Sequence, residues 1–263
     1  MTMVVFTSVK GAPGVTTTVC LVGATWPDTR SVFVAECDPS GGDLAARFAL
    51  PAAGGWPALE LASRRAGGPV PVGPYLQRLP GGLEVLTDTR TGTVPSADGA
   101  LPHLLAEASR RHDRDGDVLV DLGRLTPGVI DGVGWTERSD RVVVVLRGDS
   151  PSVIQVRERS TRFRARWGSR VGLVVIGEGQ RRSREIEQFV GVPVLATLPW
   201  DPASAAAVAG RREHPRRLRR RAPLTSAAAT LALRLLEPGT SPMVTGPTGP
   251  EVGTEAAGVG PGR

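Results

Sequence analysis

The sequence predicts an α/β fold with a single doubly wound, mostly parallel sheet and helices on both faces of that sheet. Several short segments are apolar at nearly every position, which is typical of strands that are buried on both faces. Segments of helical character separate them, and this alternation indicates a parallel sheet with crossover helices. The expected strands are Met3–Phe6, Ser31–Glu36, Val118–Asp121, Arg141–Leu146, Val171–Ile176 and Val194–Leu198.

Turns and helices complete the expected order of elements. Two further strand candidates, Tyr75–Leu79 and Leu83–Thr87, are separated by P-G-G, which predicts a hairpin or a tight corner. Residues 238–263 are mainly Gly, Pro, Thr, Ser and Val without periodicity, so we expect a disordered tail after one domain at 1–237. The expected helices are Val19–Ala24, a short one ending at Phe48, Trp56–Arg65, Ala100–His112, Ser152–Trp167, Ser183–Val190, Ala203–Arg212 and Leu224–Leu236.

Composition limits the classes of protein that this chain can represent. The 263 residues are 40% hydrophobic but only 4% aromatic, so we expect a core of Val, Leu and Ala. No apolar run approaches the roughly 20 residues of a membrane span, and the N-terminus lacks a signal-peptide pattern, so we expect a cytoplasmic protein. Cys20 and Cys37 lack metal-type spacing, and we expect both to be buried apolar side chains.

The positive charge is distributed unevenly along the chain. The net charge is +6, from 32 basic and 26 acidic residues. Arg211–Arg221 holds seven arginines, and further arginines lie along Ser152–Arg170. One interpretation is nonspecific binding to DNA phosphates. The other is a solvated helix surface in an arginine-rich chain, and the sequence leaves both open.

The stretch Thr7–Thr18, T-S-V-K-G-A-P-G-V-T-T-T, combines a strand end, a glycine-containing turn and the start of an apolar helix. This is the arrangement of a P-loop, in which backbone amides and a helix N-terminus bind phosphate. The strict pattern G-x-x-x-x-G-K-[ST] fails at Val9 and Val15. Lys10 is the only lysine among the 32 basic residues, which favours a position that requires a compact ammonium group over a chance occurrence.

Three of the expected strands end in polar or flexible segments, at Thr7–Thr17, Asp38–Asp43 and Asp121–Arg124. In an open parallel sheet, ligands bind beyond the carboxyl ends of the strands. Glycine-turn amides, a hydroxyl group and two carboxylates together suit a phosphate group with Mg²⁺. The alternative is that Asp38 and Asp121 only cap turns after buried strands. Their combination with the P-loop-like stretch favours the phosphate site.

Four segments, taken together, carry a family resemblance. They are K-G-A-P-G-V-T-T at 10–17, V-F-V-A-E-C-D-P-S-G-G-D-L at 32–44, D-V-L-V-D-L-G at 117–123 and V-P-V-L-A-T-L-P-W-D-P at 192–202. In this order they resemble the deviant Walker A motif, the second motif, the Walker B strand and the late nucleotide loop of the ParA/MinD group of P-loop ATPases. The resemblance covers about residues 1 to 236. It implies a P-loop NTPase fold with ATP and Mg²⁺ as cofactors.

The resemblance also implies roles for individual residues. Lys10 matches the signature lysine, a catalytic residue that in this group reaches across an ATP-bridged dimer to the partner's phosphates. Asp38 matches the catalytic carboxylate that orients the attacking water beside the metal. Asp121 matches the Walker B carboxylate that holds Mg²⁺ through water, and the Thr16 hydroxyl would bind Mg²⁺ directly. The matched phosphate cradle consists of Lys10, Gly11, Gly14, Val15, Thr16 and Thr17.

The chain departs from the group's pattern at several positions. Val15 replaces the lysine that holds the β and γ phosphates, and Pro13 removes a backbone N–H from the turn. A lost charge-assisted contact is worth about 1.5 to 3 kcal/mol, or roughly tenfold to over a hundredfold in affinity. Glu36 replaces the first aspartate of the second motif, and G-E-G-Q at 177–180 replaces an adenine-reading asparagine. We therefore expect weakened nucleotide binding, weak or lost hydrolysis and no asparagine-based reading of the base.

The resemblance implies an ATP-dependent positioning or partitioning switch that acts as a homodimer, with DNA contact through Arg211–Arg221 and a partner protein that the sequence does not identify. The alternative is a pseudo-ATPase scaffold. The altered P-loop and D-L-G-R at 121–124 resemble the TadZ/CpaE pilus-localisation branch, although we expect no receiver-like N-terminal domain of the kind common in that branch. An iron–sulfur or other metabolic enzyme is less favoured, because the two cysteines lack cluster spacing. The tail has no apolar face, unlike the membrane-targeting helix of MinD proteins.

Overall fold

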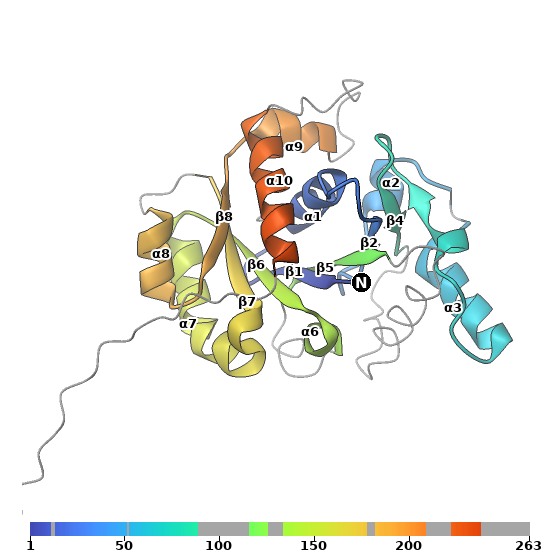
Figure 1. Cartoon of the computed structure of the whole chain (residues 1–263), viewed down its shortest axis with the longest axis horizontal. Coiled ribbons are helices and arrows are strands. Elements are labelled where there is room, and N and C mark those ends of the chain that lie inside the picture. Colours follow the sequence, from blue (N-terminus) through green and yellow to red (C-terminus); the bar gives the residue numbers. More distant parts are fainter. Residues whose placement is uncertain are drawn as a thin grey trace, which may run out of the picture.

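The structure is a computed structural model that describes residues 1–11, 14–51, 53–88, 116–125, 134–177, 182–208 and 222–237. Its strands are β1 Met3–Ser8, β2 Val32–Glu36, β3 Gln77–Arg78, β4 Glu84–Leu86, β5 Asp117–Arg124, β6 Arg141–Arg147, β7 Val171–Ile176 and β8 Val194–Leu198. They form one eight-stranded sheet in the order β3-β4-β2-β5-β1-β6-β7-β8 (Figure 1). All neighbouring strands are parallel except β3 and β4, which are antiparallel. The predicted fold class is confirmed.

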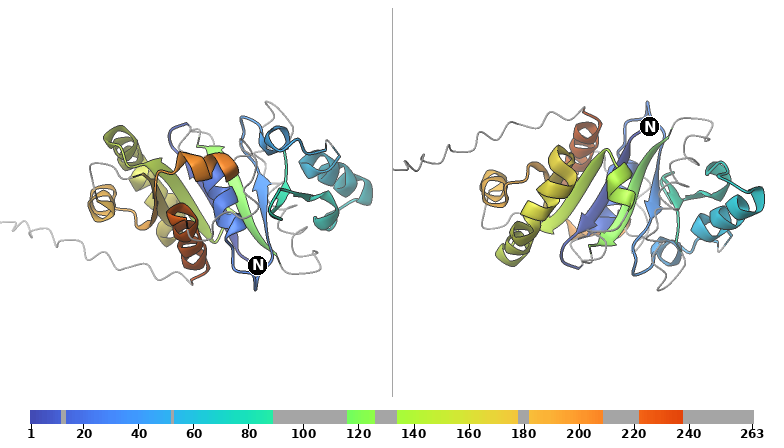
Figure 2. Two further views of the ribbon diagram at one scale, coloured as in Figure 1. Left: turned by 90° about the horizontal axis from the view of Figure 1, so that it is seen from above. Right: turned by 90° about the horizontal axis from the view of Figure 1, so that it is seen from below.

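Helices cover both faces of the sheet (Figure 2). Their bounds are α1 Val15–Ala24, α2 Leu44–Arg47, α3 Gly55–Ala66, η1 Gly73–Tyr75, α6 Gly134–Arg138, α7 Ser150–Trp167, η2 Gly168–Arg170, α8 Ser183–Val190, α9 Pro202–Val208 and α10 Pro223–Leu236. Apolar side chains of α1, α2, α9 and α10 join the core cluster on one face. Those of α3, α6, α7 and α8 join the cluster on the other face.

The central strand β1 shows why most strand positions are apolar. Met3 and Val5 join the cluster that includes α7, whereas Val4 and Phe6 join the cluster that includes α1. All four side chains are buried. Because successive residues of a strand point to opposite faces and both faces are covered, these four positions are all apolar. Thr7 and Ser8, at the carboxyl end of β1, are its only polar residues.

The strand order reverses at β1. From β1 the chain crosses to β2 on one side of the sheet, and β6, β7 and β8 are later added on the other side. In open α/β sheets, ligands bind in the crevice beyond the carboxyl ends of the strands at such a reversal. The segment that follows β1, which contains Lys10, Gly11 and Gly14, therefore lies where a ligand site is expected.

Most predicted boundaries agree with the structure to within a few residues. The helix predicted from Val19 starts at Val15, so Thr16 and Thr17 belong to its first turn. The strands predicted at 75–79 and 83–87 are shorter in the structure, where they are β3 and β4. Their antiparallel pairing agrees with the predicted hairpin. The short helix α6 was not predicted, because its five residues are too few to show periodicity.

Several predictions concern residues outside the described ranges. These are the helix at 100–112, the end of the helix predicted to reach Arg212, the basic run Arg211–Arg221 and the tail from 238 onward. Within the described ranges, no helix is both long enough and apolar enough to cross a membrane. Cys20 and Cys37 are buried and form no disulfide with each other, as expected. Besides Val, Leu and Ala, the core contains large aromatic side chains, among them Trp56, Trp135 and Trp167.

Candidate functional site

The start of α1 is arranged to bind an anion. Gly14 is the N-cap of this helix and has φ 92° and ψ 36°, a left-handed conformation that favours glycine. The helical hydrogen bonds begin with Thr18 N–H, which donates to the Gly14 carbonyl at 2.9 Å. The first turn contains no acidic residue, and no side chain caps it. Its leading amides and the positive end of the helix dipole can therefore bind phosphate.

The predicted metal ligands Thr16 and Asp121 are brought into contact. Asp121 lies on β5 between Phe6 of β1 and Glu36 of β2 in register, and it is buried. The Thr16 side chain hydrogen-bonds to the Asp121 carboxylate, and the Gly123 amide donates to its Oδ1 at 3.1 Å. Burial raises the pKa of Asp121 to about 6 despite these two hydrogen bonds. A cation beside this carboxylate would offset the cost of burying its charge.

Asp38 lies beside Asp121 because a glycine leaves room for it. A Cβ atom at Gly123, whose φ is 56°, would lie 1.9 Å from Oδ2 of Asp38. The Ser40 amide donates to Oδ1 of Asp38 at 2.8 Å, which fixes the carboxylate in the turn after β2. The Gly123 carbonyl accepts a hydrogen bond from Thr7 Oγ1 at 3.1 Å, so the ends of β1 and β5 are tied together. The position of Asp38 thus depends on the glycine of D-L-G.

Glu36 holds the loop that carries Asp38. Its Oε1 accepts hydrogen bonds from the amides of Asp43 and Leu44, each at 2.9 Å, and its Oε2 accepts one from Asp88 N–H at 3.2 Å. Burial is the main reason that the pKa of Glu36 is raised to about 7, and the three amides oppose that rise. Glu36 therefore positions the loop, a role that sequence comparison with a D-x-D motif does not show. A buried carboxylate directly before a Gly-rich turn is the signal that could have indicated it.

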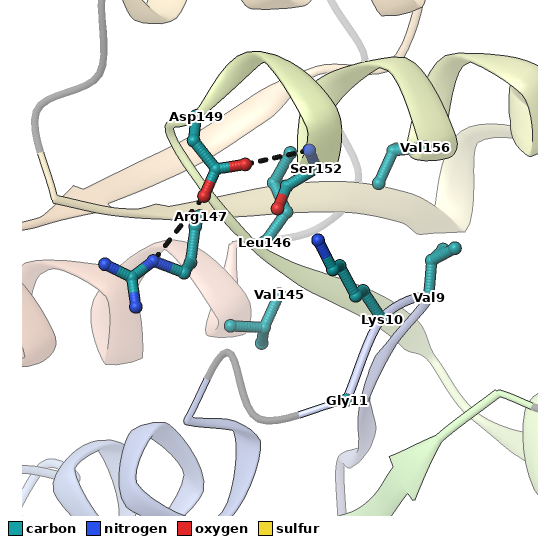
Figure 3. A pocket seen from close by; sticks show the side chains of 9 residues that line it. All are labelled: Val9, Lys10, Gly11, Val145, Leu146, Arg147, Asp149, Ser152 and Val156. Atoms are coloured by element: carbon teal, nitrogen blue, oxygen red, sulfur yellow. Dashed lines mark hydrogen bonds and ion pairs between the residues drawn. The ribbon is translucent and has the colours of Figure 1, made fainter.

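Lys10 lies on the other side of the loop, away from this carboxylate cluster. It lines a pocket of about 240 Å³ and points toward the first turn of α7 (Figure 3). Asp149 caps α7 by accepting a hydrogen bond from Ser152 N–H at 2.9 Å. The hydrogen bonds from Ser152, aided by the charges of Lys10 and Arg147, lower the pKa of Asp149. The pocket is lined by Val9, Lys10, Gly11, Val145, Leu146, Arg147, Asp149, Ser152 and Val156.

Val15, the residue at the position of the missing lysine, contributes only to the core. Its side chain is buried in the apolar cluster on the α1 face of the sheet, together with Val19 and Leu198. It has no polar atom for a phosphate group. Thr17, on the same turn, is partly exposed. The structure thus places the backbone amide of Val15 in the candidate cradle and its side chain outside it.

Comparison with known proteins decides the type of fold. No protein-family model matches the chain, and no curated protein matches it. A ParA family ATPase from Chlorobium tepidum TLS matches with TM-score 0.68 and 18% identity over 88% of this chain and 98% of that chain. A chain of the MinC:MinD cell division protein complex of Aquifex aeolicus matches with TM-score 0.69 and 17% identity over 89% and 96%. The chain has the fold of MinD and ParA-family ATPases.

A third solved structure with the MinD/ParA fold contains a nucleotide. It is the septum site-determining protein MinD from Pyrococcus horikoshii OT3, complexed with Mg-ADP. It matches with TM-score 0.64 and 14% identity over 88% of this chain and 94% of that chain. At these identities the similarity establishes the fold but not the roles of individual residues.

The MinD/ParA fold of this chain brings the three predicted segments to one edge of the sheet. Thr16, Asp38 and Asp121 lie together there, whereas Lys10 faces α7. Among the described residues, no three His, Cys, Asp or Glu side chains are grouped to hold a metal ion alone. The oxygen atoms present are of the kind that Mg²⁺ prefers when phosphate and water complete its coordination. The residues therefore fit Mg²⁺ that arrives with a nucleotide.

Proposed function

We propose that this protein binds ATP with Mg²⁺ and acts in the cytoplasm as a ParA/MinD-type positioning or partitioning switch with weak or no hydrolysis. The observation that supports this most strongly is the contact between Thr16 and the buried Asp121 at the start of α1. It combines a hydroxyl group, a carboxylate and leading helix amides at the reversal of strand order. The similarity to MinD and ParA structures supports the same conclusion.

Each residue of the site has a distinct task in this proposal. Gly11 and Gly14 shape the loop, and the amides of Val15, Thr16 and Thr17 donate to phosphate oxygens. Thr16 and Asp121 would hold Mg²⁺, the aspartate through water, and Asp38, which lies beside Asp121, would orient a water molecule. Bound Mg²⁺ would neutralise charge that develops on the phosphates.

Hydrolysis is expected to be weak because the side chain that should stabilise the phosphates is missing. Val15 is buried in the core and offers no donor, so only Lys10 can supply an ammonium group in the loop. Lys10 is exposed, so a second subunit can reach it. We therefore propose that nucleotide promotes a homodimer, with Lys10 contributing to the partner's site. DNA contact through Arg211–Arg221 and contact with a partner protein are further parts of this proposal.

Calorimetric titration of Mg-ATP into the full-length protein tests the proposal. Wild type should bind, and Thr16→Val, which keeps the shape but removes the hydroxyl, should lose the Mg²⁺-dependent part of the affinity. The control is Thr25→Val, the same change at the opposite end of α1, where the hydroxyl donates to the carbonyls of Leu21 at 2.9 Å and Val22 at 3.3 Å. Absence of wild-type binding at millimolar Mg-ATP would contradict the proposal.

The second candidate function is a scaffold of the TadZ/CpaE type that keeps the fold without turnover. The buried apolar side chain of Val15 favours it, because a chain under selection for hydrolysis needs a donor there. This alternative predicts no phosphate release with or without DNA. Turnover that is abolished by Asp38→Ala would exclude it.

A further inference from the structure

Trp200 differs from the other tryptophans of this protein in its exposure. The chain has five tryptophans. Trp26, Trp56, Trp135 and Trp167 are 5%, 0%, 0% and 2% exposed, whereas Trp200 is 58% exposed. A large aromatic ring in solvent is costly to keep and is the kind of side chain that dominates binding sites. Trp200 is therefore a candidate binding residue.

Trp200 lies beside the P-loop-like segment at the same edge of the sheet. Arg147 of β6, Ile176 of β7 and Leu198 of β8 are paired across the sheet in one row, and Trp200 follows two residues after Leu198. A Cβ atom at Gly14 would lie 3.7 Å from Cδ1 of Ile176, so the cradle glycine contacts this same row. The indole ring is thus adjacent to the strand ends that flank the candidate phosphate site.

The position of the Trp200 side chain is set by its neighbours. The guanidinium carbon of Arg147 lies 4.4 Å from the centroid of the indole ring, a cation–π contact. A Cβ atom at Gly177 would lie 3.6 Å from Cβ of Trp200, so the end of β7 packs against the base of this side chain. The next residue, Asp201, caps α9 by accepting from Ser204 N–H at 3.0 Å. The ring is therefore held in place while most of it stays open to solvent.

Arg147 connects the ring to the loop. It lines the pocket that also contains Lys10 and Gly11, and its Nε lies 3.6 Å from Oδ2 of Asp149 (Figure 3). A flat aromatic surface bordered by a cation therefore lies beside a site suited to phosphate groups. The ligand that combines a planar aromatic ring with a chain of phosphates is a nucleotide.

We infer that Trp200, supported by Arg147, binds the nucleotide base by stacking, so that the site accepts purine bases with little discrimination. This inference rests on the proposed nucleotide-binding function and adds the residue that binds the base. Stacking on an aromatic side chain commonly raises affinity about tenfold or more, and it tolerates any base because every base has a π face. Mg-ATP and Mg-GTP should therefore bind with affinities within about threefold of each other.

The test compares ligands with and without a base on the full-length protein. Mg-ATP, Mg-GTP and Mg-tripolyphosphate are titrated, and binding is measured by calorimetry and tryptophan emission. Both nucleotides should bind at least tenfold more tightly than tripolyphosphate and quench the emission of Trp200. Trp200→Ala should reduce nucleotide affinity to that of tripolyphosphate, and Trp200→Phe should keep it within about threefold of wild type. The control is Leu233→Ala, because Leu233 on α10 is also 58% exposed.

The outcomes separate this inference from the function on which it rests. If tripolyphosphate binds as tightly as the nucleotides, or Trp200→Ala leaves nucleotide affinity unchanged, the inference is wrong and phosphate binding stands. An ATP preference of tenfold or more over GTP would also overturn it, because hydrogen bonds would then read the base. If none of the three ligands binds, both the inference and the proposed function are wrong.

Discussion

The two sides of the candidate site differ in how firmly the chain holds them. On the carboxylate side, Asp121 and Glu36 are buried, and backbone amides or a hydroxyl group donate to each. On the opposite side, Lys10, Arg147 and Trp200 are exposed, and the contact between Arg147 and Trp200 lies at the surface. The first side is built by folding itself, because an unpartnered buried carboxylate would cost too much. In the proposed function, a ligand or a second subunit completes the second side.

Replacement of Gly123, the glycine next to Asp38, should be the most destabilising change on the carboxylate side of the site. In Gly123→Ala, a Cβ atom 1.9 Å from Oδ2 of Asp38 and a φ of 56° should together reduce the free energy of unfolding by about 2 to 5 kcal/mol. Gly67→Ala is the matched control, because Gly67 has φ 68° and nothing within 4 Å of the added Cβ. It should lose only about 1 kcal/mol. Equal losses in denaturant titrations would show that backbone strain alone matters.

Introducing a lysine at position 15, the first residue of α1, should strengthen phosphate binding by the loop. Val15→Lys should raise Mg-ATP affinity by roughly tenfold to a hundredfold, since a charge-assisted contact is worth about 1.5 to 3 kcal/mol. The lysine stem can stay in the apolar cluster while its ammonium group reaches solvent. Val15→Met, which has a similar length without charge, is the control for calorimetry. Equal affinities of the two variants would mean that the loop cannot present the charge to phosphate.

The buried carboxylates Asp121 and Glu36 should make the free energy of unfolding fall as pH rises. The pKa values of Asp121 and Glu36 are raised to about 6 and about 7, whereas both groups ionise near pH 4 in the unfolded chain. Between these values the folded state binds more protons than the unfolded state. The free energy of unfolding without metal or nucleotide should therefore decrease by about 1 to 3 kcal/mol from pH 5 to pH 8.

A substitution pair checks this dependence by chemical denaturation at each pH. Asp121→Asn should flatten the decrease by on the order of 1 kcal/mol, because the amide does not ionise. Asp201→Asn should leave it unchanged. The pKa of Asp201 is lowered by its hydrogen bonds with Ser204, so its own contribution changes only below about pH 4. A profile that rises from pH 5 to pH 8 would contradict the assignment of Asp121 and Glu36.

The smallest effect on stability is expected on the side of the site that contains Lys10. Lys10→Ala should change the free energy of unfolding by less than about 0.5 kcal/mol, because Lys10 is exposed. In the presence of Mg-ATP it should nevertheless reduce the dimer fraction measured by analytical ultracentrifugation. Lys10→Arg keeps the charge but replaces the compact ammonium with a planar group, and it should rescue the dimer only in part. A wild-type mass that stays monomeric at millimolar Mg-ATP would exclude the nucleotide-dependent dimer.

Much of the carboxylate side could be predicted from the sequence because local patterns determine it. Continuous apolar runs predicted the strands. Polar segments that follow three of these strands predicted that Thr16, Asp38 and Asp121 lie close together. The roles of Glu36 and Gly123 were not predicted. Both depend on contacts between segments far apart in the chain, such as the bond from Asp88 to Glu36 across 52 positions.

The sequence by itself determined the α/β class, the positions of most strands and helices, and the altered loop around Lys10. It could do so because burial on both faces of a sheet requires apolar strands, and because the residues of a phosphate-binding loop are adjacent in the sequence. Only the tertiary structure decided that Lys10 faces α7, that Gly123 makes room for Asp38, and that Arg147 lies over the exposed Trp200. These contacts join segments that lie at or just after the ends of different strands, so the strand order and its reversal at β1 create them.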